Sequence, residues 1–304
     1  MNKITVFTPT YNRAYCLHKC FESLLRQTCK DFDWLIIDDG STDNTSELVN
    51  NWKNQNPPFN INYIYKENGG MHTAYNTAYE HIDSELCMNI DSDDYLTDTA
   101  INDILTFWNK YKREDIGGIY ALDQYENGDI IGSKFPEDLH EFRGWGYKTI
   151  FYETNGIKKK YKNKGDKKFI GVTEIIKKYP SIPVFKNEKY HSLYYKQHLI
   201  EQDHTILIMN KPVCVVEYLD DGSSKNMYYQ YIKNPKGFCD ERKFVMKNAP
   251  TFKLRLEASI HYVAESLIAK DYNLIKHSTN RLSTIPALLP GFMLYLLIKW
   301  RTHK

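Results

Sequence analysis

The sequence lacks the cysteine spacing of a disulfide scaffold or a zinc site. None of its six cysteines belongs to a Cys-x-x-Cys pair, and no apolar export signal precedes the strand-like run at residues 4–7. Because disulfide frameworks belong to oxidising compartments, we expect a cytoplasmic protein. Its cysteines are then mostly small core residues, Cys87 and Cys214 in particular.

Internal repeats, low-complexity tracts and interleaved basic and aromatic residues are also absent, so neither a repeat architecture nor a nucleic-acid partner is expected. The 304 residues, 42% of them hydrophobic, suffice for one large core and a smaller appendage. The formal net charge of +2 hides an asymmetry. Residues 1–98 hold 7 Lys and Arg against 15 Asp and Glu, whereas residues 225–304 hold 14 against 5.

The first part of the chain repeats one pattern three times. A strand-like run is followed by a polar or Gly-containing turn and then by a segment with helical spacing of apolar residues; the strand-like runs are residues 4–7, 34–37 and 62–65. Strands that alternate with helices indicate a parallel sheet with right-handed crossovers. The polar turns should then lie together at the carboxyl edge of the sheet, where such folds bind ligands.

A fourth apolar run, residues 86–90, leads into Asp91-Ser92-Asp93-Asp94. Two carboxylates one residue apart can hold a hard divalent cation, and a partly hydrated cation can bridge to the phosphates of a nucleotide. The alternative is an ordinary solvated acidic turn at the end of a strand. The third carboxylate, Asp94, could assist Asp93, but we expect it to brace the loop.

Taken in order, these turns resemble a known family. Pro9-Thr10-Tyr11-Asn12, the segment 37–43, Asn68-Gly69-Gly70 and Asp91-Ser92-Asp93-Asp94 together resemble family 2 inverting glycosyltransferases of the GT-A fold. A weaker likeness, in segments 183–189 and 210–218, is to the acceptor side of bacterial members that build surface polysaccharides. The resemblance implies an α/β fold with a Rossmann-like, mostly parallel central sheet flanked by helices, and a C-terminal helical extension.

The resemblance also implies roles for individual residues. Asp93 would ligate a divalent cation, Mn²⁺ or Mg²⁺, and the donor, a nucleotide-sugar that is expected to be a UDP-sugar, would be bound by Thr8, Pro9, Thr10, Tyr11, Asn12, Asp39, Gly69, Gly70, Asp91 and Ser92. Within this set, the first segment and Asp39 would hold the nucleobase. Two alternatives stay open: Gly69-Gly70 could be a tight turn instead of a phosphate cradle, and Asp43 could simply cap the next helix.

Inverting transfer needs a general base for the acceptor hydroxyl. Where much of the family has a Glu-Asp pair, this chain has Glu188-Lys189, so we expect Glu188 to be the base. It could instead pair with a cation or orient the acceptor. Glu201 and Asp203 are reserve candidates in a polar stretch that is typical of an exposed turn.

We expect a glycosyltransferase domain at 1–224, with a nucleotide-sugar half at 1–98 and an acceptor half at 99–224, and a helical extension at 225–304. The boundary is placed at the polar cluster of residues 220–224. The lysine-rich run 158–168 is expected to be too polar to bury. We expect it to be a solvated loop, or else a cationic flap that meets phosphates.

The C-terminal extension contains a nearly uninterrupted apolar stretch at 285–298, followed by Lys299, Trp300 and Arg301. Its 14 residues include two prolines and fall short of the ~20 needed to span a bilayer. A short apolar segment flanked by Trp and cations suits the interface of an anionic leaflet. A buried terminal helix and a contact in a homo-oligomer are the alternatives.

Together these features predict a metal-dependent inverting glycosyltransferase of the hexosyltransferase class. It would move a sugar from a UDP-sugar to a hydroxyl of a growing, lipid-linked cell-surface glycan, at the inner face of the cytoplasmic membrane. The alternatives are a nucleotidyltransferase, although no Gly-rich basic signature for a triphosphate opens the chain, and a non-catalytic scaffold that binds sugar or membrane.

Overall fold

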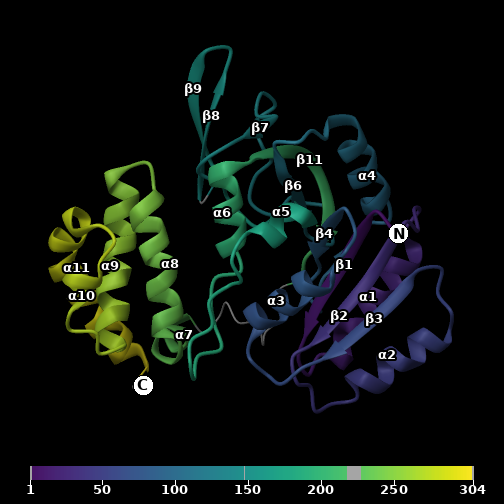
Figure 1. Ribbon diagram of the computed structural model, residues 1–304, viewed down its shortest axis with the longest axis horizontal. Coiled ribbons are helices and arrows are strands. Elements are labelled where there is room, and N and C mark those ends of the chain that lie inside the picture. The colour runs from purple at the N-terminus through teal and green to yellow at the C-terminus, as the bar shows by residue number, and fades with distance from the viewer. Residues whose placement is uncertain (1, 147, 218–226, 303–304) are drawn as a thin grey trace. The chain divides into compact units, whose positions relative to one another are not determined.

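A computed structural model describes residues 2–146, 148–217 and 227–302 (Figure 1). The chain divides into two compact units, the first made of Met1–Ser181 and Lys196–Leu219, the second of Ile182–Tyr195 and Asp220–Lys304. The boundary expected at 220–224 lies outside the described residues. The segment Ile182–Tyr195, which was expected in the first domain, belongs to the second unit.

The first unit is built on a mixed sheet. Nine strands of its described part are arranged in the order β3-β2-β1-β4-β10-β6-β11-β5, with β7 paired to β11. The strands are β1 (Ile4–Thr10), β2 (Phe32–Asp38), β3 (Asn60–Tyr65), β4 (Leu86–Asn89), β5 (Tyr95–Leu96), β6 (Ile116–Gln124), β7 (Glu141–Phe142), β10 (Lys167–Val172) and β11 (Thr205–Val215). The first four strands run parallel to one another, and β10 lies between β4 and β6, antiparallel to both.

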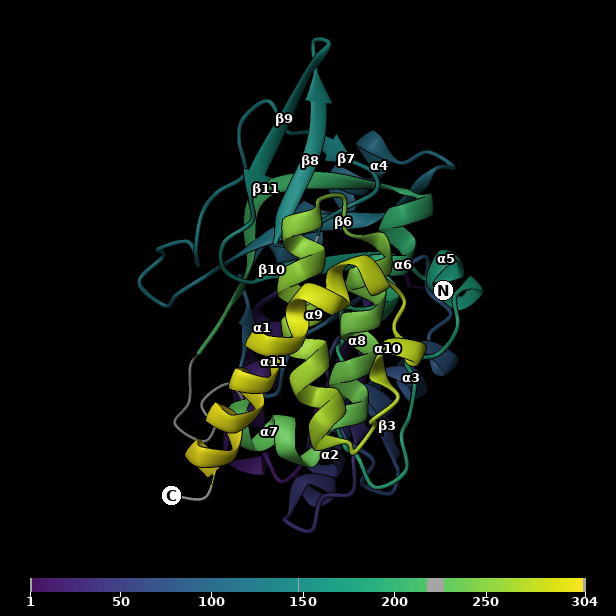
Figure 2. The same ribbon diagram turned by 90° about the vertical axis from the view of Figure 1, so that its left-hand side faces the viewer.

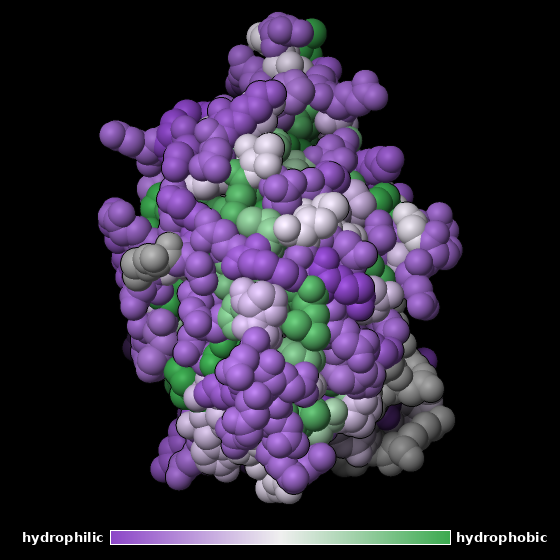
Figure 3. Space-filling view, turned by 90° about the vertical axis from the view of Figure 1, so that its right-hand side faces the viewer, coloured by the Kyte–Doolittle hydropathy of each residue, from purple (hydrophilic) through white to green (hydrophobic). Residues whose placement is uncertain are grey.

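Helices cover both faces of this sheet because side chains alternate along each strand. On β1, Ile4 and Val6 belong to the core shared with α1 (Ala14–Arg26), α2 (Thr45–Asn54) and α4 (Ala100–Tyr111). The intervening Phe7 points to the opposite face, where its ring meets Tyr75 of α3 (Met71–His81) edge-on at 5.0 Å. The helices α5 (Thr173–Lys178) and α6 (Tyr195–Asp203) follow later in the chain. The side of the molecule in Figure 3 is mainly hydrophilic, with apolar atoms only in patches.

The lysine-rich run 158–168 is not a loop. Its first part forms β9 (Ile157–Lys162), which pairs with β8 (Thr149–Thr154) in an exposed hairpin, and its end begins the central strand β10. Residues 158–166 are exposed or half-buried, as expected of so polar a run, but Lys167 and Lys168 are only 8% and 5% exposed, so the expectation was wrong for these two residues. Lys167 is tolerated inside because its ammonium donates to three backbone carbonyls, those of Lys164, Ile131 and Asp166.

The second unit is helical. It contains α7 (Met227–Lys233), α8 (Pro235–Asn248), α9 (Phe252–Ile268), α10 (Leu274–His277) and α11 (Arg281–Thr302) (Figures 1 and 2). Thr251 caps α9 by accepting from the Leu254 N–H at 3.3 Å, and the fully buried Tyr262 donates to the carbonyl of Leu274.

Helix α11 is longer than the apolar stretch suggested, because it runs through Pro286 and Pro290. At 22 residues, with a mean hydropathy of 1.6 over its most apolar window, it is long and apolar enough to cross a membrane. The expectation that this segment is too short to span was therefore wrong. About 28% of that window is buried within the protein.

Candidate donor and metal site at the carboxyl edge of the sheet

The carboxyl ends of the first three strands lie level with one another. Thr10 of β1 is paired in register with Asp38 of β2, and Asp38 with Tyr65 of β3. The strand β4 ends at Asn89, and the Ile90 N–H donates to the carbonyl of Phe7. The prediction that the polar turns meet at one edge of a parallel arrangement is confirmed.

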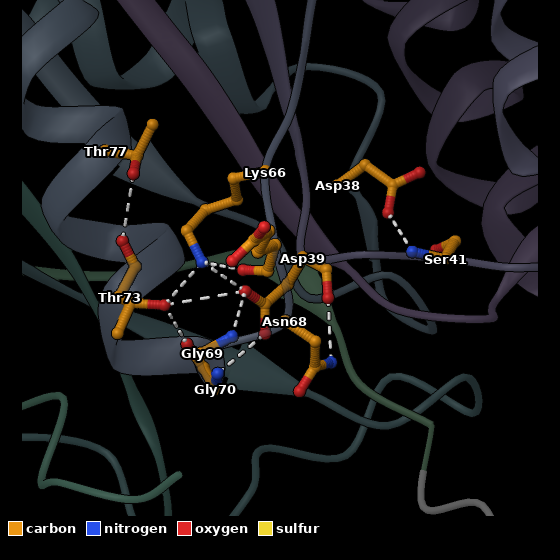
Figure 4. Close-up of polar contacts among 10 residues, drawn as sticks. Asp38, Asp39, Ser41, Lys66, Asn68, Gly69, Gly70, Thr73 and Thr77 are labelled. Atoms are coloured by element: carbon orange, nitrogen blue, oxygen red, sulfur yellow. Dashed lines mark hydrogen bonds and ion pairs between the residues drawn. The ribbon is translucent and has the colours of Figure 1, made fainter. Parts of the chain in front are cut away.

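The turn after β2 is organised around the carboxylate of Asp39, whose side chain is 5% exposed. Figure 4 shows Lys66, Gly69 and Gly70 gathered around it. Its Oδ1 accepts from Lys66 Nζ at 2.5 Å and from the Gly69 N–H at 3.0 Å, and its Oδ2 accepts from the Gly70 N–H at 2.8 Å. A carboxylate offers about four acceptor positions, so these donors leave Oδ2 one further position for a ligand.

The contacts of Asp39 show what kind of turn Gly69 and Gly70 form. Gly70 has φ +95° at the start of α3, and a Cβ on Gly69 would lie 2.7 Å from Thr73 Oγ1, so each position favours glycine. Because both N–H groups already donate to Asp39, the geometry is that of a tight turn closed by a carboxylate. A phosphate bound through those N–H groups would have to displace Asp39.

Asp38, the preceding carboxylate, holds the turn itself. It accepts from the Ser41 N–H at 2.7 Å and from the Tyr63 hydroxyl at 2.6 Å. Burial, together with the hydrogen bond to Asp38, raises the pKa of Tyr63. Asp43 accepts from the N–H of Ala14, the first residue of α1, and from the N–H and hydroxyl of Thr45, the first residue of α2. It therefore satisfies N–H groups at two helix starts, although the N-cap of α2 is Asn44.

The residues expected to hold the nucleobase follow the end of β1. Thr8 is fully buried, and its hydroxyl accepts from the indole of Trp34 at 2.9 Å. Thr10 is also buried, with no hydrogen-bond partner for its hydroxyl oxygen in the described part of the structure. Tyr11 is 48% exposed, and Asn12, at φ +52°, accepts from the Thr42 N–H. Of this set, Tyr11 is thus the side chain accessible for stacking on a base.

The turn after β4 carries the proposed metal ligands. Asp91 is half-buried and accepts from the Asn89 amide at 3.1 Å, and Ser92 is 8% exposed. Asp93 is 20% exposed at its side chain and lies 3.7 Å from the guanidinium of Arg13. Asp94 is buried and accepts from the Glu217 N–H at 3.2 Å, so it braces the loop as expected.

Beneath this turn lies a buried group of charges that the sequence did not reveal. Burial alone would lower the pKa of Lys168, but Cys214, Asp123, Asp94 and Asp91 raise it well above its usual value. The Cys214 thiol keeps its proton because burial raises its own pKa, so the carboxyl groups supply the negative charge that holds the lysine.

The same burial acts on the partners of Lys168. It raises the pKa of Asp94 to about 8 and that of Asp123 to about 6, and Lys168 opposes both shifts. Asp123 is 2% exposed, and its Oδ1 has no hydrogen-bond partner within the described chain. Lys168 is therefore the internal cation of the acidic turn.

A divalent cation fits this edge only if the donor helps to hold it. Across residues 2–146, 148–217 and 227–302, no three His, Cys, Asp or Glu side chains converge on one point. Mg²⁺ and Mn²⁺ accept one or two carboxylates and take phosphate or water oxygens as their other ligands. Asp91 and Asp93 offer carboxylates of that number and kind.

The candidate bases have other roles in the structure. Glu188 is 9% exposed, and its two oxygens accept from the N–H groups of Lys236 and Gly237 at the start of α8. Glu201 does not lie in an exposed turn: it is 1% exposed within α6 and accepts from the Tyr120 hydroxyl and the Gly146 N–H. Asp203, at the end of α6, accepts from the Tyr179 hydroxyl.

The family model described as glycosyl transferase family 2 matches residues 5–172, more than half of the chain. The chain belongs to this family. It is therefore a glycosyltransferase, and the resemblance in its turns is confirmed.

Curated relatives match part of this glycosyltransferase. Glycosyltransferase GlyA of Streptococcus pneumoniae is 28% identical over 46% of this chain, and chondroitin synthase of Pasteurella multocida is 30% identical over 54%. The matched regions make up 20% and 18% of those two proteins. The chain thus corresponds to about a fifth of the length of either relative.

Solved structures share the fold of this glycosyltransferase. S. aureus TarS, residues 1–349 in complex with UDP-GlcNAc, has a TM-score of 0.56 at 16% identity, over 97% of this chain and 81% of that one. The mannosyltransferase PcManGT of Pyrobaculum calidifontis, in complex with GDP-Man and Mn²⁺, has the same TM-score at 14% identity, over 97% and 87%. The expected GT-A fold, a central sheet flanked by helices with a helical C-terminal part, is confirmed.

Proposed function

We propose that this glycosyltransferase moves a sugar from a UDP-sugar, with a divalent cation, to a hydroxyl of a growing cell-surface glycan, with inversion at the anomeric carbon. The observation that carries the proposal is the meeting of the Asp39 turn and the Asp91–Asp94 turn at one sheet edge. The UDP-GlcNAc bound to TarS supports a UDP-sugar, and the synthases of chondroitin and hyaluronan among the relatives support a glycan product.

In this proposal the chain's own residues position the donor. Asp39 accepts from the base through the remaining position on Oδ2, and the exposed ring of Tyr11 packs on the base. Asp91 and Asp93 would hold a Mn²⁺ or Mg²⁺ ion, which when bound would offset the charge of the departing diphosphate. Arg13 stays within reach of Asp93 and neutralises part of its charge.

We propose Glu188 as the general base. The acceptor oxygen would attack the anomeric carbon, the bond from that carbon to the diphosphate would break, and the hydroxyl proton would pass to the Glu188 carboxylate. The contacts with Lys236 and Gly237 give the same carboxylate a capping role at α8. The two roles predict different results on substitution.

The acceptor is proposed to be lipid-linked and presented at the inner face of the cytoplasmic membrane. The support is the apolar helix α11 with its flanking cations, in a C-terminal part with 14 Lys and Arg against 5 Asp and Glu. An enzyme held at that surface would meet a membrane-anchored glycan by diffusion in two dimensions.

The donor part of the proposal is tested with the purified chain, a panel of UDP-, GDP- and CDP-sugars, and Mn²⁺ or Mg²⁺ added or chelated. Calorimetry should detect binding of a UDP-sugar that weakens at least ~10-fold when the cation is removed. Slow release of UDP should follow the same preference. Transfer of a nucleoside monophosphate to product would instead show a nucleotidyltransferase, and binding without turnover on cell-envelope lipids would favour a scaffold.

The base is tested with Glu188→Gln, with the exposed Glu257→Gln as its control. We expect transfer to fall by ~10²- to 10⁴-fold while the affinity for the donor stays unchanged, since a positioned base acts only on the acceptor's proton. If activity falls only as far as the folded fraction does, Glu188 is a capping residue. Asp203 would then be the next residue to test.

A further inference from the structure

Helix α11 has a face that packs within its own unit. Its buried residues are Ser283, Thr284, Ala287, Gly291 and Ile298. A Cβ on Gly291 would lie 2.5 Å from Val263 Cβ of α9 and 2.8 Å from the carbonyl of Ile260, so the two helix backbones approach closely. This face is fixed to α9 along the helix.

The other face of α11 is apolar and exposed, and we refer to it as the α11 stripe. It consists of Leu282, Ile285, Leu289, Phe292, Met293, Leu296, Leu297 and Trp300, each at least 40% exposed. Their spacing of three or four residues places them on one side of the helix. Monomeric soluble proteins rarely expose a contiguous apolar row of this size, so the stripe indicates a contact surface.

Cations surround the α11 stripe. Lys276 of α10 and Arg281 lie near its beginning, and Lys299 and Arg301 near its end. In the described chain no carboxylate pairs with any of these four, in contrast to Arg242, which lies 3.5 Å from the buried Glu265. Helix α11 itself contains no Asp or Glu. The surface therefore combines apolar side chains with uncompensated positive charge.

A cavity of about 540 Å³ lies beside the start of α11. Its lining joins two cations, Lys276 and Arg281, to the apolar or aromatic side chains of Tyr272, Leu274, Ile275 and Leu288, with Asn273 between them. A negatively charged head group with attached hydrocarbon matches such a lining, because the ammonium and guanidinium can meet phosphate oxygens while the chain follows Leu288.

The α11 stripe could be covered by a second copy of this chain or by a membrane, and the charges around it favour the membrane. A second copy of this chain packed stripe to stripe would bring Arg281, Lys299 and Arg301 against cations of the same kind, in either orientation. A bilayer with anionic lipids supplies both hydrocarbon and negative charge. A helix packed on α9 along its inner face can lie in the membrane interface without leaving α9, whereas crossing the bilayer would require it to separate.

We propose that the α11 stripe lies flat in the head-group region of an anionic bilayer, with a lipid phosphate bound between Lys276 and Arg281. The proposal rests on the membrane part of the proposed function and makes it specific. The apolar side chains supply the depth of insertion, and the cations supply the preference for anionic lipid.

The test uses the full chain and flotation with vesicles of phosphatidylcholine, with or without phosphatidylglycerol. Two pairs of variants are matched for charge and chemistry. Lys276→Gln/Arg281→Gln is compared with Lys247→Gln/Lys253→Gln, which removes two exposed cations elsewhere on the same unit. Leu289→Glu/Met293→Glu is compared with Val184→Glu/Phe252→Glu, two exposed apolar residues outside the stripe.

We expect phosphatidylglycerol to tighten binding of the parent chain at least ~10-fold. Lys276→Gln/Arg281→Gln should weaken it by about 10- to 30-fold, and Leu289→Glu/Met293→Glu by more than that, with smaller losses in both controls. All four substituted positions are exposed, so melting temperatures should stay near the parent value.

The proposal is overturned if the chain binds vesicles with and without phosphatidylglycerol equally well. It is also overturned if Lys276→Gln/Arg281→Gln loses no more vesicle affinity than Lys247→Gln/Lys253→Gln. It is also overturned if Leu289→Glu/Met293→Glu converts a dimer to a monomer in light scattering without affecting flotation, which would show a contact between copies. UDP binding is measured on every variant. If the parent chain does not bind UDP, the proposed donor is contradicted. The vesicle results test the membrane proposal independently of the donor.

Discussion

The two acidic turns at the sheet edge are built differently. After β2, Asp38 and Asp39 are held by donors from within the turn, from Tyr63 of β3 and from the loop that follows β3, with directed bonds of 2.5–3.0 Å. After β4, Asp93 lies 3.7 Å from the guanidinium of Arg13, and the charges of Asp91 and Asp94 help to raise the pKa of the buried Lys168 on β10.

The first turn is distinguished by its fixed shape, and the second by its excess of carboxyl groups. Directed hydrogen bonds fix the shape of the first turn, so it can present an acceptor to a base without rearranging. The second turn, with Asp123 beneath it, holds more carboxyl groups than cations, so an added cation gains most there. The proposed function uses this difference, with the first turn recognising the base and the second holding metal and diphosphate.

The largest expected effect comes from removing the internal cation of the second turn. Lys168→Met should lower the free energy of unfolding by about 3–5 kcal/mol, because it leaves buried carboxyl groups without their partner. Chemical denaturation measures the loss, with Lys177→Met, which breaks an exposed pair with Asp83, as the control. A loss no larger than that of the control would contradict the assigned role.

The same variant has a predicted pH dependence. Burial raises the folded-state pKa of Asp123 to about 6 and that of Asp94 to about 8, so the stability linked to their protons is full below the unfolded value near 4 and is lost as pH rises through 6 and 8. Without Lys168 both values rise further. The loss in free energy of unfolding caused by Lys168→Met should therefore be smaller at pH 5 than at pH 8. A loss that does not change with pH would exclude these carboxyl groups as its cause.

Next in size is the effect of the proposed metal ligand. Asp93→Asn should reduce turnover by ~10²-fold or more and abolish the cation dependence of donor binding, since an amide holds a divalent ion poorly. Asp98→Asn is the matched control, because Asp98 is exposed and pairs only with Arg26 in the described structure. Near-normal transfer by Asp93→Asn would remove this residue from the site.

A smaller effect is expected at the first turn. Asp39→Asn replaces charge-assisted bonds to Lys66, Gly69 and Gly70, each worth about 1.5–3 kcal/mol, and should weaken UDP binding by roughly 10- to 100-fold. Titration calorimetry without added metal isolates this turn from the second one. Asp33→Asn, at the opposite end of β2, should leave UDP affinity unchanged. An equal loss in both variants would show a general effect on the sheet.

The smallest effect is expected at Asp43. Asp43→Ala should cost about 1 kcal/mol of stability, because it removes an acceptor for N–H groups at the starts of α1 and α2, and should leave donor affinity as it is. Asp43→Asn keeps an acceptor oxygen and should recover most of the loss. A drop in UDP affinity would show that the residue belongs to the site.

The parts of the fold that the sequence predicts are those set by local pattern. Alternating apolar strands, polar turns and helical spacing are enough to identify the parallel half of the sheet, and they place Asp39 and Asp91 at the same edge. Local signals suffice there because a strand's carboxyl end and its turn are adjacent in the chain.

The remaining features depend on residues far apart in the sequence. Lys168 looked solvent-exposed because its neighbours are lysines, and only Asp94 and Asp123, from other parts of the chain, explain its burial. Glu188 was expected to act as a base, yet its contacts are with a helix that starts at Pro235. Such pairings leave no periodic trace in a single sequence.

The position of β10 has a consequence for how this protein is made. Strand β10 separates β4 from β6, so the edge of β4 has no partner until residues 167–172 have emerged from the ribosome. At about 5–20 residues per second, that edge stays open for roughly 4–16 seconds of synthesis. Since Lys168 arrives on the same strand, the acidic turn receives its internal cation in the step that joins β4 to β6, before β11 is added.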